Sequence, residues 1–155
     1  FFTQKRVGRC GKTFTVLKIR TMRHVEGVTT TVTSTGDPRI TPLGAFLRKT
    51  KIDELPQLIN VLLGEMSFVG PRPDVPGFAD KLEDESKAML SIRPGITGPA
   101  TLKYRNEEIV LAQQDDPEKY NREVIWPDKV RINLEYIRKW SLMGDIKYIK
   151  ETVIK

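Results

Sequence analysis

The sequence contains a single cysteine, Cys10, and a single histidine, His24, among its 155 residues. One cysteine excludes an internal disulfide framework, and the two residues together are too few to form a Cys/His zinc site. A hard cation held by oxygen ligands remains open. Both residues fit ordinary surface positions, because Cys10 lies in an expected turn and His24 lies at the edge of an expected loop.

Long hydrophobic runs are also missing from the sequence. No window of the chain approaches the roughly 18 apolar residues that a membrane span requires, and no signal peptide opens it. The first two residues are Phe1 and Phe2, in the middle of an expected strand and without an initiating methionine. We therefore expect that an N-terminal portion of the protein precedes this segment.

The composition is that of a folded domain with a basic surface. Apolar residues make up 39% of the chain and charged residues 30%, which fits one domain with a modest core. The 26 Lys and Arg residues outnumber the 20 Asp and Glu residues, and the net charge of +6 favours anionic partners. The aromatic residues lie at apolar helical or strand positions instead of among the basic residues, which argues against nucleic acid.

The first third of the chain predicts a β-hairpin, a loop and a helix. Residues 1–20 alternate in two runs around a turn at 8–11, which is typical of a hairpin. The threonine-rich segment 24–36 predicts a loop, with a short edge strand as the alternative. Thr41 as N-cap and Pro42 at the first helical position then open a helix.

The remaining chain reads mainly as helices. The pattern predicts a core helix over about 54–63, ended by Gly64, and a charged helix over about 75–90. Two loops, 66–73 and 93–99, each place an arginine beside proline and glycine. The last third carries a broad apolar stripe that predicts core packing, with contact to a membrane or a partner as the alternative. The fold class expected is α/β or α+β, a small hairpin or sheet packed by several helices in a single domain.

Asp53 and Glu54 form an adjacent carboxylate pair at the expected start of an apolar helix. Helix starts favour anions, because free N–H groups and the positive end of the helix dipole meet there. Successive helical residues diverge by about 100°. Both carboxylates can therefore serve one site if Asp53 is the N-cap and Glu54 lies in the first turn. Helix capping without any catalytic part is the other interpretation.

Five motifs occur in a fixed order along the chain: Lys18-Ile19-Arg20-Thr21-Met22, Asp37-Pro38-Arg39-Ile40-Thr41-Pro42-Leu43-Gly44, Asp53-Glu54-Leu55-Pro56-Gln57, Gly70-Pro71-Arg72-Pro73 and Arg93-Pro94-Gly95-Ile96-Thr97-Gly98. Together they resemble the motifs of the bacterial sugar transferases, and more narrowly the monotopic polyprenyl-phosphate phosphoglycosyltransferases. The resemblance covers nearly the whole length, so residues 1–155 are expected to be a sugar transferase catalytic domain. It also implies a location at the cytoplasmic face of the bacterial inner membrane, through a membrane segment that precedes this domain in the family.

The resemblance implies a two-step displacement. Asp53 matches the family's nucleophile, which attacks the sugar-linked phosphorus of a nucleoside-diphosphate sugar, such as a UDP-sugar, and retains a phosphosugar. A polyprenyl phosphate then carries that phosphosugar away, which begins the synthesis of a surface glycan. Glu54 matches the metal-binding carboxylate, and Mg²⁺ with nearby arginine would offset the repulsion between Asp53 and the diphosphate.

Basic residues of the motifs are candidates for binding phosphate. Arg72, between two prolines, matches a phosphate-binding position of the family and has the forked donors that this role needs. Four others lie in or beside the motifs, where they line the same pocket, face lipid headgroups or are simply solvated: Lys18, Arg20, Arg48 and Arg93. Gln57 either orders the site or packs the helix. The alternative to an enzyme is a catalytically silent basic module that docks on an anionic membrane.

Overall fold

The computed structural model describes residues 1–23, 25 and 36–154. Most of the loop predicted over 24–36 therefore lies outside the described residues. Strands β1 (Phe2–Val7) and β2 (Thr13–Lys18) pair antiparallel, with Phe2 opposite Lys18. A tight turn at Arg9–Gly11 joins them, in which the exposed Cys10 has a φ of 57°. The predicted hairpin is confirmed.

A second sheet pairs β3 (Ser67–Val69) with β4 (Gly95–Thr97) in parallel. Glycines allow a close approach beside these strands. A Cβ at Gly95 would lie only 2.2 Å from the backbone nitrogen of Gly70, so a larger residue would not fit there. The prediction of a plain loop over 93–99 was therefore incomplete. A strand of three residues is too short to produce a recognisable alternation of apolar and polar side chains.

Helix α1 (Pro42–Thr50) begins as predicted, with Gly44 N donating to the Thr41 hydroxyl at 2.9 Å. Lys51 then takes a left-handed conformation with φ of 60°, which ends the helix. A 3₁₀ turn, Ile52–Glu54, follows, and the next helix, α2 (Gln57–Leu62), begins only after Pro56. The predicted helix of 54–63 is thus shorter at its start, and it ends before Gly64 as expected.

Helix α2 buries the face opposite to the one predicted. Its buried residues are the polar Gln57 and Asn60, each 2% exposed. The apolar residues expected in the core are exposed instead: Leu55 (55%), Leu58 (40%), Ile59 (48%) and Leu62 (87%). The cause is the Asn60 carboxamide, which donates to Thr15 O at 2.8 Å and accepts from Leu17 N at 3.3 Å. These bonds to β2 turn the polar side of α2 inward.

The single charged helix predicted over 75–90 is also wrong. The segment instead forms two 3₁₀ segments, Ala79–Lys81 and Asp84–Ser91. Two residues with positive φ interrupt a continuous α-helix, Gly77 at 106° and Asp84 at 49°. Local backbone conformation therefore overrides the helical pattern of the sequence here.

From residue 116 onward the chain is helical, as predicted: α5 (Pro117–Tyr120), a π-helical turn (Asn121–Ile125), α6 (Trp126–Arg138) and α7 (Leu142–Val153). Two short helices before it, α3 (Pro99–Lys103) and α4 (Glu107–Ala112), were not predicted. Asp116 caps α5 and Ser141 caps α7. The apolar stripe divides: Val130 and Leu134 of α6 pack on the buried core, whereas Trp140 is 59% exposed.

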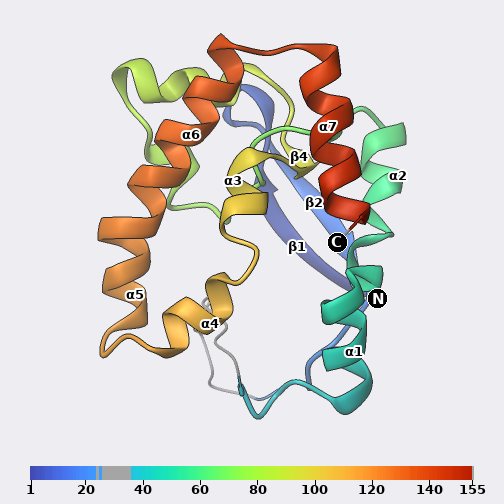
Figure 1. Cartoon of the computed structure of the whole chain (residues 1–155). Coiled ribbons are helices and arrows are strands. Elements are labelled where there is room, and N and C mark those ends of the chain that lie inside the picture. Colours follow the sequence, from blue (N-terminus) through green and yellow to red (C-terminus); the bar gives the residue numbers. More distant parts are fainter. Residues whose placement is uncertain (24, 26–35, 155) are drawn as a thin grey trace.

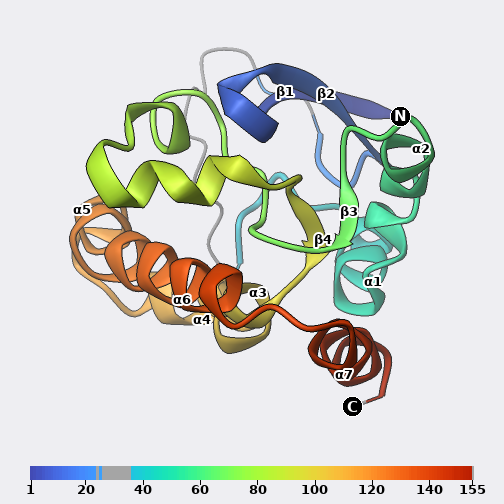
Figure 2. The ribbon, with the colours of Figure 1, turned by 90° about the horizontal axis from the view of Figure 1, so that it is seen from above.

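The hairpin lies along one edge of the molecule, and α6 and α7 lie towards the opposite edge (Figure 2). In Figure 1, α5 and α6 lie on the left, and α1, α2 and α7 lie on the right. Buried Val7, Ala79 and Met89 form the core between the hairpin, the 3₁₀ segments and α6. Small two-stranded sheets packed by helices confirm the predicted fold class. Within the described residues, no helix is both long enough and apolar enough to cross a membrane.

Candidate active site

The carboxylate pair lies on the 3₁₀ turn that follows α1. The backbone carbonyl of Asp53 accepts from Ile19 N at 2.9 Å, which ties this turn to the end of β2. Both side chains are buried, with Asp53 8% and Glu54 9% exposed. The prediction that Asp53 caps the helix was wrong, because the left-handed Lys51 starts a separate 3₁₀ turn and α2 begins at Gln57.

Glu54 is held by two cations from distant parts of the chain. Lys18 at the end of β2 lies 3.2 Å from Oε1, and Arg72 donates from Nη1 to Oε2 at 3.2 Å and from Nη2 to Oε1. Burial opposes ionisation, but the charges of Arg72 and Lys18 hold the pKa of Glu54 well below its usual range. Glu54 is therefore an ionised anchor for both cations, and the charge of one of them, Lys18, also acts on Asp53.

Asp53 differs sharply from its neighbour. Its Oδ1 atom is buried and makes no hydrogen bond with any part of the chain that the structure describes. Burial and the charge of Glu54 raise the pKa of Asp53, against the charges of Lys18, Lys51 and Arg48. Buried polar atoms are nearly always partnered, so this Asp53 oxygen, like Gln57 Nε2, Thr101 Oγ1 and Asn133 Oδ1, is free to bond to a water or to another molecule.

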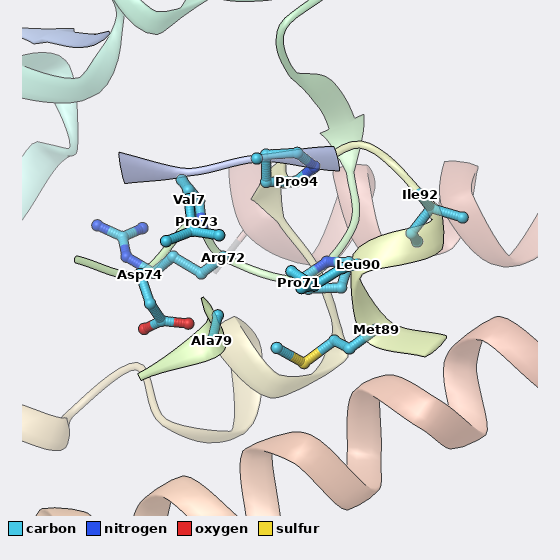
Figure 3. Close-up of a pocket in the computed structure, with 11 residues that line it drawn as sticks. Val7, Pro71, Arg72, Pro73, Asp74, Ala79, Met89, Leu90, Ile92 and Pro94 are labelled. Carbon is cyan, nitrogen blue, oxygen red and sulfur yellow. The ribbon is translucent and has the colours of Figure 1, made fainter. Parts of the chain in front are cut away.

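The loop that carries Arg72 is fixed from two sides. Pro71 O accepts from Gly95 N at 2.8 Å, and Pro73 O accepts from the Arg6 guanidinium at 3.1 Å. Both prolines are buried, so the predicted rigid setting of Arg72 is confirmed. Figure 3 shows the mainly apolar pocket behind this loop, in which the Arg72 side chain extends away from Met89.

The other predicted basic residues are not all at this cluster. Arg48 on α1 pairs with Glu108 on α4 at 2.6 Å, and its charge still lowers the pKa of Asp53. Arg20 is exposed, with its guanidinium 5.9 Å from the centre of the Phe2 ring. Arg93 is exposed beside Gly64, at the C-terminal end of α2. The structure thus brings Lys18 and Arg72 together at Glu54, keeps Arg48 near Asp53, and leaves Arg20 and Arg93 outside.

Four charged residues beside Arg72 were not predicted from the sequence: Arg6, Asp74, Glu107 and Lys129. Burial raises the pKa of Asp74 to about 6, against the charges of Lys129, Arg6 and Arg72. Lys129 pairs with Glu107 at 2.7 and 2.8 Å. Arg6 occurs in an alternating strand and Lys129 in a helix that otherwise indicates core packing, so neither position carried a distinguishing signal.

The carboxylates fit a magnesium ion in donor chemistry. Within the described ranges, no group of three or more His, Cys, Asp or Glu side chains is placed to hold a metal by itself. Mg²⁺ commonly needs only one or two protein carboxylates, since substrate phosphates and water complete its shell. The free Asp53 oxygen suits such a cation, whereas at Glu54 the cation would have to compete with Lys18 and Arg72.

Comparison with known proteins defines the class of protein. Residues 1–155 match the family described as "Bacterial sugar transferase", and the chain belongs to this family. The resemblance noted in the sequence is thereby confirmed. The carboxylates Asp53 and Glu54 and the cations Lys18 and Arg72 therefore belong to a sugar transferase domain.

The relatives are sugar or sugar-phosphate transferases by name. The chain is 40% identical to "UDP-glucose:undecaprenyl-phosphate glucose-1-phosphate transferase" of Escherichia coli (strain K12), over 99% of this chain and 32% of the relative. It is 37% identical to "Galactosyl transferase CpsE" of Streptococcus agalactiae, over 98% of this chain and 33% of the relative. A 49% identical stretch covers 54% of this chain and 48% of "Putative undecaprenyl-phosphate N-acetylgalactosaminyl 1-phosphate transferase" of Bacillus subtilis. The chain spans about a third of the length of the first two relatives.

Proposed function

We propose that this chain is the catalytic part of an enzyme that transfers a sugar phosphate from a nucleoside-diphosphate sugar, such as a UDP-sugar, to a polyprenyl phosphate. This reaction would begin the synthesis of a surface glycan. Family membership and the named reactions of the relatives support the proposal. The observation that carries it is the buried, unpartnered oxygen of Asp53 beside the Lys18, Glu54 and Arg72 cluster.

In the first step, a carboxylate oxygen of Asp53 attacks the phosphorus that bears the sugar. The bond from this phosphorus to the bridging oxygen breaks, and its electron pair leaves with the nucleoside monophosphate. An aspartyl phosphosugar remains on the enzyme. In the second step, a phosphate oxygen of the polyprenyl phosphate attacks the same phosphorus and releases Asp53 as a carboxylate.

The surrounding residues make this approach of anions feasible. Arg72 offers forked donors to phosphate oxygens, and Lys18 adds a point charge on the same side of the carboxylates. Glu54 holds both cations at the ends of their side chains through the ion pairs described above. Glu54 would hold Mg²⁺ if Lys18 and Arg72 turned from it to the substrate phosphates, and the ion would then neutralise charge on the diphosphate.

The second substrate is a lipid, and one side of the molecule suits a membrane surface. Figures 1 and 2 place α1, α2 and α7 together on that side. Exposed apolar side chains are concentrated on these helices and on β3: Leu43, Phe46, Leu58, Ile59, Leu62, Leu63, Phe68, Leu142, Met143, Ile146, Ile149 and Val153. We call this set the apolar face. Its contact with the cytoplasmic leaflet would bring Asp53 to the polyprenyl phosphate.

A second candidate function is a catalytically silent basic module that docks on an anionic membrane. The apolar face and the net charge of +6 favour this function equally well. It gives no reason, however, to bury an unpartnered carboxylate oxygen next to the ion-paired Glu54. The two functions therefore differ in what they require of Asp53.

The intact mass of the full-length protein tests the proposal. We would incubate it with Mg²⁺ and a panel of UDP-sugars, and compare wild type with Asp53→Asn and Asp116→Asn. Asp116 is a matched control, because it is an exposed carboxylate that caps α5 and asparagine caps equally well. We expect the mass of a phosphosugar to be added to wild type and Asp116→Asn only.

Two results would contradict the proposal in different ways. An adduct on Asp53→Asn would show that another residue is the nucleophile. Folded wild type that neither gains an adduct nor transfers sugar phosphate to polyprenyl phosphate would favour the silent module.

A further inference from the structure

We infer that Arg6 is a positioning residue for Arg72, an inference that rests on the proposed function. Arg6 lies on β1, 66 positions before Arg72 in the sequence and outside the motifs that define the family resemblance. It is not expected to touch the substrate. Its role is to fix the loop on which Arg72 reaches Glu54 and the phosphate groups.

Strand β1 forms hydrogen bonds with Pro73 and Asp74, the two residues that follow Arg72. Arg6 Nη1 donates to Pro73 O at 3.1 Å, and the next residue, Val7, donates from its backbone nitrogen to Asp74 O at 2.9 Å. Arg6 Nη2 donates to Gln4 Oε1 at 2.6 Å, which holds the guanidinium along its own strand. The loop is therefore attached to β1 immediately after Arg72, while Gly95 of β4 holds Pro71 before it.

A neutral donor could also bond to Pro73 O, and it would avoid the cost of burying a charge. The presence of a cation at this position therefore points to a role for its charge. Arg6 faces the like charge of Arg72, and the carboxylates of Asp74 and Glu54 offset that repulsion. Burial and Arg72 lower the pKa of Arg6 to about 10, so it stays charged at neutral pH. Arg6 thus adds positive potential behind the phosphate-binding arginine.

Loss of this contact would free the loop immediately after Arg72. A displacement of a catalytic group by about 1 Å can cost on the order of 100-fold in rate. We expect Arg6→Met to lower kcat/KM by roughly 10- to 100-fold on the same grounds. Arg6→Lys keeps the charge but not the two separate donors, and we expect an intermediate loss.

The test is a double-mutant cycle on the full-length enzyme with Arg72→Lys. If Arg6 acts through Arg72, Arg6→Met will cost much less in the Arg72→Lys background than in wild type. Arg9→Met is the matched control, because Arg9 is on the same hairpin and donates to a backbone carbonyl, Ser91 O, at 3.0 Å. We expect Arg9→Met to stay within about twofold of wild type, as surface substitutions usually do.

A loss of equal factor in both backgrounds would overturn the inference, as would an Arg6→Met enzyme with wild-type kcat/KM. Circular dichroism melting checks that each variant is folded. If Arg6→Met does not fold, Arg6→Lys and Arg6→Gln take its place in the cycle, under the same criterion. Wild-type enzyme without any transfer would overturn the proposed function, and this inference with it.

Discussion

Among the single residues of the site, Lys18 is the cation whose charge changes closest to neutral pH. Burial and the charge of Arg72 lower its pKa to about 8, although Glu54 opposes this shift. Protonated Lys18 pairs with Glu54 at 3.2 Å. As the pH rises through 8, the amine loses its proton, Glu54 loses one partner and the site loses one positive charge.

We therefore predict that kcat/KM of the full-length enzyme declines above about pH 8 and that Lys18→Arg moves this decline to higher pH, because arginine stays protonated. The pH profile is the readout, since Lys18→Arg will also change the absolute rate. Lys12→Arg, an exposed lysine in the turn region of the same hairpin, is the control and should keep the wild-type profile. An unchanged alkaline limb in Lys18→Arg would exclude Lys18 as its source.

The residues of the site were partly predictable. Lys18, Glu54 and Arg72 belong to sequence motifs, and the structure brings them into contact. The role of Asp53 as an N-cap was predicted from local preference, and a left-handed Lys51 overrides that preference. Arg6 could not be found from the sequence, because its contact with Pro73 joins residues 67 positions apart.

At the scale of elements, the sequence pattern of α2 correctly predicts a helix, but it predicts the wrong face of that helix to be buried. Its apolar residues recur at helical spacing, and a soluble protein would normally bury them. Asn60 instead fixes the orientation of the helix through bonds to Thr15, Leu17 and Glu65. The local caps of α1, α5 and α7 were predictable, because each depends on residues within one helical turn.

This orientation predicts that replacing the polar Asn60 destabilises the fold more than replacing an apolar residue of α2. We expect Asn60→Ala to lower the free energy of unfolding by about 2–4 kcal/mol, because it removes several hydrogen bonds of a buried residue and leaves their partners unpaired. Leu58→Ala, at a position 40% exposed, should change the free energy of unfolding by less than about 1 kcal/mol. Urea denaturation of the 155-residue chain measures both. A larger loss from Leu58→Ala would mean that the helix buries its apolar side.

For the whole molecule, the orientation of α2 explains both the support of β2 and the exposure of apolar side chains. Turning its polar side inward lets α2 support β2, whose last residue, Lys18, pairs with Glu54. It also turns Leu58, Ile59 and Leu62 outward, on the same side of the molecule as α1. The orientation of α2 thus affects both the cluster and the apolar face, so the proposed catalysis and the proposed attachment to a surface would be linked through one helix.

The apolar face predicts that the chain binds vesicles of phosphatidylethanolamine and phosphatidylglycerol through α2. Leu62 is 87% exposed and Leu63 is 69% exposed, so both are free to enter a bilayer. Each leucine should contribute about 1 kcal/mol or more, and we expect Leu62→Ser with Leu63→Ser to weaken vesicle binding by roughly tenfold or more. Ile109→Ser with Val124→Ser is the matched control, because these residues are 49% and 47% exposed but lie on α4 and the π-helical turn. Sedimentation of the folded chain with vesicles measures both, and an equal loss in the control would mean that general hydrophobicity, and not the apolar face, holds the protein to the membrane.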